Sequence, residues 1–278
     1  MGSNERSETI VITSCLRPAA TRFLSLADPV ERLRHTVASL LCWFEEPSVR
    51  NVVICDNSGV DYDFGPLVRK AETLGVDFEA LVFEDHGIAK RLGKGAGEGL
   101  ILDHVMSHSR LLASSEAFWK CTGKYWVQNF PAVASAHRSD EAVFKRPGWS
   151  YRCPFEPARF GVARAGFLWA RNRLSCLAKE VLYGFDADAN VNTQFWRTSV
   201  AFFDRVLRDK YLLVNDRRRY FIEHVYARAL TNEPVTAFRV APKIVGKSGS
   251  IDATYGGGVP PEKLADAEAL IARGLPGT

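Results

Sequence analysis

"NVVICDNSG", residues 51–59, is an apolar, β-branched run that ends in four residues typical of turns, which predicts a buried strand followed by a polar loop. "TIVITSC", residues 9–15, has the same form and leads into Arg17-Pro18. Between the two runs, Asp28-Pro29-Val30-Glu31 supplies an N-cap, a proline at the first helical position and an early carboxylate. These signals predict two strands joined by a helix.

The same alternation continues along the first half of the chain. A helix fits residues 64–75 and a third strand fits 77–84, so the order is β-α-β-α-β. A helix from about Glu98 to Ser114 and a fourth strand over 117–129 follow. This order predicts an α/β fold, a Rossmann-like and mostly parallel sheet flanked by helices, with ligands at the carboxyl ends of its strands.

The second half is less regular, because prolines interrupt it from residue 131 onward. We expect a single domain, with a nucleotide-binding half over 9–130, an acceptor and catalytic half over 131–258, and a closing helix and tail over 259–278. The elements expected in the second half are a strand, turn and helix start over 160–170, helices over 192–210 and 219–230, and an amphipathic helix over 260–273.

The bulk composition favours a cytoplasmic protein. The 278 residues are 46% hydrophobic, carry a formal net charge of +4 and contain no apolar run long enough to cross a bilayer. The six cysteines are scattered without a Cys-x-x-Cys pair, as in a protein whose thiols stay reduced. We therefore expect at most peripheral association with the inner face of a membrane.

Polar residues follow the first two strands. Ser14 and Arg17 end the first strand, and Asp56, Asn57 and Ser58 end the second. A carboxylate here can accept hydrogen bonds from a ribose or a base, and Arg17 can face a phosphate. The alternative is a capped turn, because Asp, Asn, Ser and Gly are the commonest turn residues.

"GKGAGEG", residues 93–99, places four glycines ahead of an apolar helix, with cations at Lys90, Arg91 and Lys94. Free backbone N–H groups at a helix start, together with three cations, favour a diphosphate. The order of residues in this stretch matches neither the P-loop motif nor the dinucleotide-binding fingerprint. An exposed flexible loop is the alternative.

Lys120 and Lys124 interrupt an aromatic run, Phe118 to Trp126, that we predict to be one strand. Side chains repeat every second residue along a strand, so both lysines fall on one face. A buried cation is costly unless an anion pairs with it, which points to an anionic ligand. An edge strand with snorkelling lysines is the alternative.

Glu223-His224 lies on an otherwise apolar helical stretch. Burial would raise the pKa of this carboxyl toward neutrality, as a general base requires. A salt bridge to Arg217, Arg218 or Arg219 is the alternative. Ser248 belongs to a glycine-rich stretch that either closes over a ligand or forms a mobile tail.

Taken in order, "ITSCLRP", "VICDNSG", "GKGAGEG", "KCTGKYWVQN", "IEHVYARAL" and "PKIVGKSGS" resemble bacterial GT-A-type glycosyltransferases that build capsular or O-antigen polysaccharides, in a group with Lys-x-Thr-Gly-Arg-Tyr on the fourth strand. The resemblance spans about residues 10–250 and implies a nucleotide sugar lying across the strand ends. The residues assigned to donor binding are Ser14, Arg17, Asp56, Asn57, Ser58, Lys90, Gly93, Lys94, Gly95, Glu98, Thr122, Gly123 and Ser248, and those assigned to catalysis are Glu223, His224, Lys120 and Lys124.

The sequence departs from the GT-A pattern at one point. The usual Asp-x-Asp, which holds a divalent metal on the diphosphate, is replaced by Thr122-Gly123-Lys124. Asp186-Ala187-Asp188 matches the Asp-x-Asp motif but lies well past the fourth strand, where we interpret it as a helix-capping turn. We therefore expect no metal cofactor, with Lys94, Lys120 and Lys124 neutralising the leaving group instead.

Glu223 is the first choice for the base that deprotonates the acceptor, and Glu98 and Asp85 are the reserves. The expected partners are a nucleotide sugar and a saccharide or lipid-linked saccharide, with no nucleic acid. Two alternative functions remain at this stage. A nucleotidyltransferase would take a triphosphate with Mg²⁺, and a carbohydrate- or nucleic-acid-binding module would use the basic and aromatic residues for stacking.

Overall fold

The computed structural model describes residues 8–18, 25–145, 190–249 and 253–274. The elements expected over 160–170, the pair Asp186 and Asp188, and the cysteines Cys153 and Cys176 lie outside these described residues. None of the helices in the described part is both long and apolar enough to cross a membrane.

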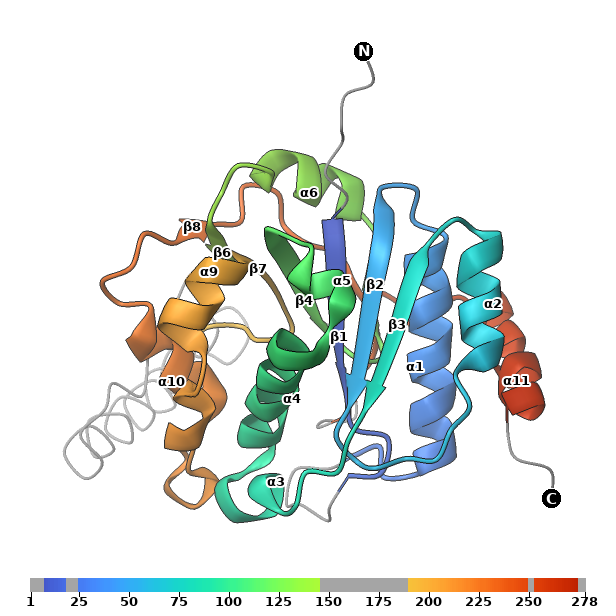
Figure 1. The fold of residues 1–278 in the computed structure, drawn as a ribbon, viewed down its shortest axis with the longest axis horizontal. Helices are drawn as coiled ribbons and strands as arrows, with labels where there is room; N and C mark the ends of the chain where they lie inside the picture. The colour runs from blue at the N-terminus through green and yellow to red at the C-terminus, as the bar shows by residue number, and fades with distance from the viewer. Residues whose placement is uncertain (1–7, 19–24, 146–189, 250–252, 275–278) are drawn as a thin grey trace, which may run out of the picture.

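A seven-stranded sheet forms the centre of the fold (Figure 1). Its strands, in spatial order, are β3 (Asp77–Val82), β2 (Val49–Asp56), β1 (Glu8–Ser14), β4 (Ala117–Thr122), β7 (Phe195–Ser199), β6 (Ala142–Phe144) and β8 (Thr236–Ala237). Only β7 runs antiparallel to its neighbours in this sheet. The predicted mostly parallel sheet flanked by helices is confirmed.

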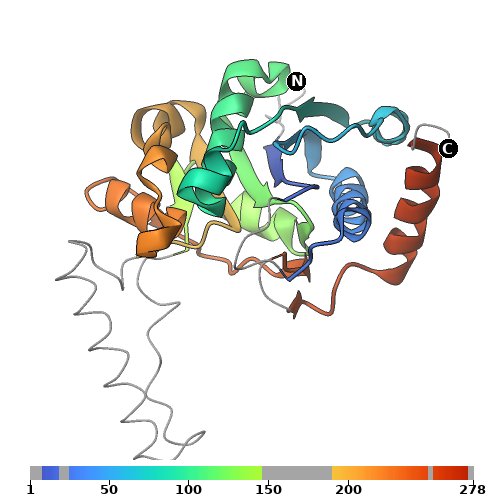
Figure 2. The ribbon, with the colours of Figure 1, turned by 90° about the horizontal axis from the view of Figure 1, so that it is seen from below.

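Helices cover both faces of the sheet, as Figures 1 and 2 show from two directions. On one face lie α1 (Pro29–Phe44), α2 (Gly65–Thr73), α6 (Phe130–His137) and α11 (Pro261–Gly274). On the other face lie α3 (Ile88–Leu92), α4 (Lys94–His108), α5 (Arg110–Ala113), α9 (Val200–Phe202), the π-helix η1 (Phe203–Leu207), the 3₁₀ helices η2 (Lys210–Leu213) and η3 (Asp216–Arg218), and α10 (Ile222–Ala229).

The alternating direction of the side chains along β1 explains why a hydrophobic core lies on each face of the sheet. Ile10 and Ile12 pack under α1, whereas Val11 points into the opposite core with α4, because successive strand residues face opposite sides. All three side chains are fully buried. Burial on both faces accounts for the nearly continuous apolar runs of the central strands.

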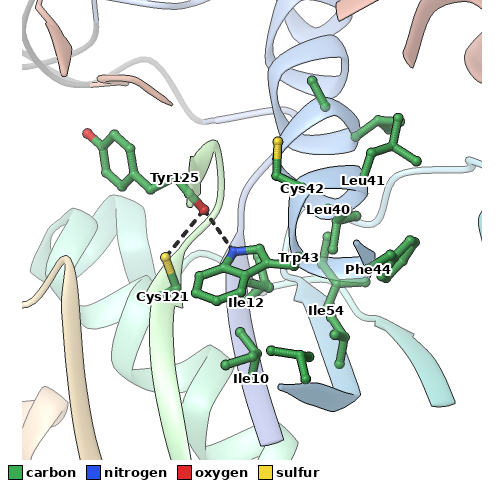
Figure 3. Packing of buried hydrophobic residues seen from close by; sticks show 14 of the residues in the cluster. Ile10, Ile12, Leu40, Leu41, Cys42, Trp43, Phe44, Ile54, Cys121 and Tyr125 are labelled. Carbon is green, nitrogen blue, oxygen red and sulfur yellow. Dashed lines mark hydrogen bonds between the residues drawn. The ribbon is translucent and has the colours of Figure 1, made fainter. Parts of the chain in front are cut away.

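The predicted start of α1 is confirmed. Asp28 accepts hydrogen bonds from the backbone N–H groups of Val30 and Glu31, at 2.8 and 3.4 Å, and Pro29 occupies the first helical position. Near its other end, Trp43 packs among Ile10, Ile12 and Ile54 (Figure 3). The helix is thus capped at its start and packed against the sheet near its end.

One backbone oxygen ties this core to the fourth strand. The Trp43 indole N–H and the Cys121 thiol both donate to the carbonyl oxygen of Tyr125, at 3.0 and 3.4 Å (Figure 3). Tyr125 begins β5 (Tyr125–Val127), which pairs with β9 (Ile244–Lys247). Two buried donors are satisfied at the point where the chain leaves the large sheet.

The predicted single strand over 117–129 is wrong. β4 ends at Thr122, and β5 belongs to a second, three-stranded sheet with β9 and β10 (Thr254–Tyr255). Gly123 makes the break: its N–H donates to the Thr13 oxygen at 2.7 Å, and a Cβ here would lie 2.9 Å from that oxygen. Lys124 follows with φ of 77°, outside strand geometry.

The predicted helix over 192–210 is also wrong in its first part, because Phe195–Ser199 forms β7 and only the residues from Val200 onward are helical. Phe195 stacks on Trp119 of the neighbouring strand, with centroids 5.0 Å apart. Aromatic pairs across strands stabilise a sheet, and this pairing overrides a spacing that also fitted a helix. The predicted helices over 219–230 and 260–273 are confirmed as α10 and α11.

Candidate functional site

The carboxyl ends of three parallel strands meet, as the sequence predicted. Ser14 of β1 lies beside Asp56 of β2, and Thr13 lies beside Thr122 of β4. The first turns of α3 and α4 lie at this same edge of the sheet (Figure 1). Any ligand of this parallel sheet would be expected here.

The Asp56 side chain binds loops of the protein itself. Its carboxylate is fully buried and accepts from the backbone N–H groups of Leu16 and Ser58, at 2.8 and 2.9 Å, and from the Ser58 hydroxyl. The Ser58 hydroxyl oxygen in turn accepts from the Arg17 N–H at 3.1 Å. The capped-turn alternative therefore describes Asp56 and Ser58, which join the loops after β1 and β2, while the Arg17 side chain is exposed.

Asn57 is also buried and links the strand ends to α4. Its backbone N–H donates to the Ser14 oxygen at 3.4 Å, and its amide nitrogen donates to the Gly97 oxygen at 3.4 Å. The residue positions α4 over the ends of β1 and β2.

The glycine stretch is not a loop before a helix, because α4 begins at Lys94 rather than near Glu98. Gly95 and Gly99 lie inside the helix, where an added Cβ would approach Ile222 and Tyr211 to 2.7 and 2.2 Å. Glycine is needed where two backbones or a backbone and a side chain approach this closely. The stretch holds η2 and α10 against α4.

The start of α4 already has a carboxylate beside it. Asp216 of η3 accepts from the Lys94 backbone N–H at 3.2 Å, and it fills the space next to Gly93, whose φ is 131°. Burial raises the pKa of Asp216, while the Lys94 N–H opposes the rise. Asp216 therefore occupies the position at this helix start that the sequence assigned to a phosphate.

Lys120 also finds its anion within the protein. This ammonium is fully buried and pairs with Glu98 of α4. It also donates to the Thr122 hydroxyl at 2.8 Å and to the Thr193 carbonyl. Thr122 in turn contacts the Glu98 carboxylate at 3.4 Å.

The surroundings of Lys124 differ from those of Lys120. It is 5% exposed, and within the described ranges no carboxylate forms an ion pair with it. Burial, together with the positive charges of Arg32 and Lys94, lowers the pKa of Lys124 to about 7, while Cys15 and Asp56 oppose this shift. Its ammonium lies close to the backbone of Gly249, because a Cβ there would be 3.3 Å from the nitrogen.

Arg32 of α1 completes a group of three cations, Arg32, Lys94 and Lys124, which we call the cation group. Arg32 is almost fully buried and donates to the carbonyl oxygens of Cys15 and Leu26, at 2.7 and 2.8 Å. Burial lowers the pKa of Arg32, with Cys15 and Asp56 opposing. Neutral carbonyl oxygens hold the guanidinium in place without cancelling its charge.

Lys94 is exposed at the surface, yet the protein atoms around its ammonium lower its pKa, with Glu98 and Glu223 opposing. The pKa of Lys94 is therefore affected both by Arg32, another member of the cation group, and by the two carboxylates. The three cations differ in access: Lys94 faces solvent, whereas Arg32 and Lys124 lie beneath the surface.

Glu223 lies near the Lys120–Glu98 pair, to which Thr193 connects it. The Thr193 hydroxyl contacts its carboxylate at 3.5 Å, while the Thr193 carbonyl accepts from Lys120. Burial raises the pKa of Glu223 and Glu98 raises it further, against Lys94 and Lys120. The predicted direction of this pKa shift is confirmed. In the described part of the chain, no ion pair joins Glu223 to the arginines at 217–219.

His224 caps its own helix. Its Nδ1 accepts from the Phe221 backbone N–H at 3.3 Å, and its ring lies 6.2 Å from that of Tyr220. Asp85, a reserve base, has a similar local role, because its carboxylate accepts from Ile88 and Ala89 at 2.7 and 2.9 Å at the start of α3.

The other predicted donor-binding residues lie around this edge. Lys90 of α3 is exposed, and Gly123 forms the turn after β4. Ser248 is buried, hydrogen-bonds the Tyr125 hydroxyl, and follows strand β9 rather than lying in a mobile tail.

Sequence reasoning missed Arg32 and Thr193. Arg32 lies on a helix that was predicted from its capping residues without a role for this side chain, and Thr193 lies in a segment predicted to be helical. Neither carries a motif. Among the described residues, no group of three or more His, Cys, Asp or Glu side chains is placed to hold a metal ion.

No protein-family model matches the sequence, and a search of curated proteins finds no match. Solved structures similar to this chain include the mannosyltransferase Ktr4p from S. cerevisiae, with 9% identity, coverage of 93% of this chain and 74% of that one, and a TM-score of 0.46. Core-mannan synthase A from Aspergillus fumigatus, in its Mn/GDP form, has 11% identity, coverage of 94% and 82%, and a TM-score of 0.43. A 4-diphosphocytidyl-2C-methyl-D-erythritol synthase from Anaerococcus prevotii has 9% identity, coverage of 98% and 100%, and a TM-score of 0.41. At these values the likeness says nothing about the reaction.

Proposed function

We propose that this chain is a glycosyltransferase that moves a sugar from a nucleotide-sugar donor to a saccharide acceptor hydroxyl in bacterial surface polysaccharide biosynthesis. The observation that carries the proposal is the cation group at the strand ends. Lys124 is buried beside Arg32, and within the described residues it has no carboxylate partner. Placing two cations together beneath the surface is costly, and an anionic ligand would offset the cost.

A diphosphate suits this position. Departure of a nucleoside diphosphate from a sugar develops negative charge on the leaving oxygen, and fixed cations stabilise that charge. Lys124 and Arg32 would face the diphosphate, with Lys94 at the solvent side. We propose that these cations supply the neutralisation for which other enzymes use a metal held by Asp-x-Asp.

Glu223 is the proposed base. A hydroxyl attacking the anomeric carbon must lose its proton, and a carboxylate with a raised pKa accepts it more readily near neutral pH. Glu223 is close enough to Glu98 and Lys94 of α4 for their charges to affect its pKa. The sugar would then lie between the cation group and Glu223.

The first test measures thermal stabilisation by CMP, CDP, UDP, GDP and ATP, each with Mn²⁺ and with EDTA. A ligand that binds only the folded state stabilises it, by about 2.7 kcal/mol at 100 times its dissociation constant. Stabilisation by one nucleoside diphosphate that survives EDTA supports the proposal. A triphosphate preference with a strict metal requirement would instead favour a nucleotidyltransferase.

Two variants separate binding from chemistry. Lys124→Met should lose the stabilisation by nucleotide, whereas Lys243→Met, which alters an exposed lysine, should retain it. Glu223→Gln should bind the donor normally but lose sugar transfer, and Glu72→Gln on the exposed surface of α2 is its control. Normal turnover by Glu223→Gln would exclude this residue as the base.

A further inference from the structure

A strongly basic surface with two exposed leucines lies beside the candidate site. Leu212 and Leu213 end η2 with 50% and 58% of their surfaces exposed. Three consecutive arginines, Arg217, Arg218 and Arg219, follow within a few residues, and all three are exposed. We call these five residues the Leu-Arg surface.

The Leu-Arg surface is held rigidly from beneath. Tyr211 and Val214, which flank the leucines, are buried, and Tyr211 packs against Gly99 of α4. Asn215 and Tyr220 exchange backbone hydrogen bonds of 2.8 and 3.0 Å around the arginines. The leucines are therefore exposed by a well-anchored backbone rather than by a loose one.

Helix α4 brings the leucines and the arginines together. Tyr211 lies at the level of Gly99, and Asp216 lies at the level of Gly93, so the two parts are about 9 Å apart along the helix at 1.5 Å per residue. Lys90 and Arg91 of α3, just before Gly93, add two exposed cations at the same end, near the bottom of Figure 1.

Within the residues that the structure describes, no acidic side chain pairs with the arginines of the Leu-Arg surface. None of the ion pairs among the described residues involves Arg217, Arg218 or Arg219. The exposed acid of this segment is Asp209, at the amino end of η2, while the Asp216 carboxylate points inward to Lys94. The Leu-Arg surface is therefore positive as well as apolar at its edge.

We propose that the Leu-Arg surface binds the interface of an anionic lipid bilayer. Arginines near such a surface are attracted to the lipid phosphates, and apolar side chains beside them insert into the boundary with the acyl chains. A soluble polyanion would use the arginines but would gain nothing from the two leucines. The combination favours a membrane.

Docking in this way would bring the membrane beside α10. Ile222 begins α10 three residues after Arg219, and Glu223 follows in the first turn. A bilayer bound here would lie next to the proposed acceptor side. Binding itself does not depend on the reaction, so its failure would leave the proposed function untouched.

The test is cosedimentation of the full chain with vesicles of phosphatidylcholine alone and with added phosphatidylglycerol. We expect binding only to the anionic vesicles. Arg217→Gln, Arg218→Gln and Arg219→Asn combined should weaken binding about 100-fold, at roughly fivefold per charge. Asparagine is chosen at 219 because φ there is 56°, which asparagine tolerates.

The leucines are tested separately, by Leu212→Ser with Leu213→Ser, which should weaken binding about tenfold or more and remove the part that resists high salt. Matched controls are Arg50→Gln with Arg69→Gln and Arg273→Gln, and Val30→Ser with Leu74→Ser, all exposed elsewhere. Unchanged thermal unfolding of each variant confirms folding.

Three results would overturn the inference. The first is no binding to anionic vesicles. The second is an equal loss of binding in the matched controls. The third is normal vesicle binding by the leucine variant together with equally tight binding of heparin, which would assign the arginines to a soluble polyanion.

Discussion

Replacing Lys124 with methionine should make the ligand-free protein more stable while it abolishes nucleotide binding. The side chain is 5% exposed, and its pKa falls from 10.5 in a solvated lysine to about 7 in the fold. Each pKa unit corresponds to about 1.36 kcal/mol. Methionine has a similar shape and no charge, so the substitution removes the cost of burying the ammonium.

The expected gain in stability from Lys124→Met depends on pH. Below pH 7 the ammonium is charged in both folded and unfolded chains, so the whole penalty is present. Between pH 7 and 10 the unfolded chain binds the extra proton, and the stability of the wild type rises with pH. The gain from Lys124→Met should therefore be about 5 kcal/mol at pH 6 and about 2 kcal/mol at pH 9, as upper bounds.

Urea denaturation of Lys124→Met, wild type and the exposed-lysine control Lys243→Met, from pH 6 to 9, measures these differences. The control should stay near the wild type throughout. A Lys124→Met protein that is less stable than the wild type at pH 6, or a difference that does not change with pH, would show that Lys124 has an anionic partner in the protein. The argument for a ligand at the cation group would then fail.

Two further predictions concern contacts inside the site. Lys120→Met should destabilise the fold by about 3–5 kcal/mol in chemical denaturation, because Glu98 loses its partner. Adding Glu98→Gln to this variant should recover much of the lost stability. Independent, additive losses of stability would contradict the pairing of Lys120 with Glu98. Gly99→Ala should cost about 1–3 kcal/mol, because its methyl group would meet Tyr211, and Tyr211→Ala should suppress the additional effect of the alanine; a Gly99→Ala protein as stable as the wild type would contradict the close approach.

The Lys120 result also changes how a catalytic experiment should be interpreted. From the sequence, Lys120 and Lys124 were equivalent lysines on one strand. In the structure, Lys120 is neutralised by Glu98, whereas Lys124 lies beyond the strand break with Arg32. Loss of activity in a Lys120 variant can follow from lost stability alone, so Lys124 is the informative position.

Local signals were enough to predict much of the fold. The Asp28 cap, the apolar runs at 9–15 and 51–59 and the closing helix are each encoded within a few consecutive residues. Strand direction followed from the alternation with helices, since parallel strands need crossovers. The meeting of the polar strand ends followed from strand direction in turn.

Contacts between distant segments could not be predicted in this way. The segment that forms β7 was predicted to be helical because Phe195, Phe202 and Val206 have helical spacing, and only its pairing with β4 shows that it is a strand. The roles of Asp56 and Glu98 depended on which donors lie opposite them. A turn carboxylate looks the same in the sequence whether it binds a ribose or the next loop.

The glycines at 93–99 show most clearly which features follow from the sequence and which from the tertiary structure. The sequence by itself determined that four glycines lie at the start of an apolar helix and that cations lie nearby. Tertiary structure decided that the close neighbours are Ile222, Tyr211 and Asp216, which belong to a distant segment of the chain. Composition determines which charges a chain must neutralise, but only the folded arrangement decides whether the protein or a ligand supplies the counter-charge, because Coulomb and packing energies depend on distance in space.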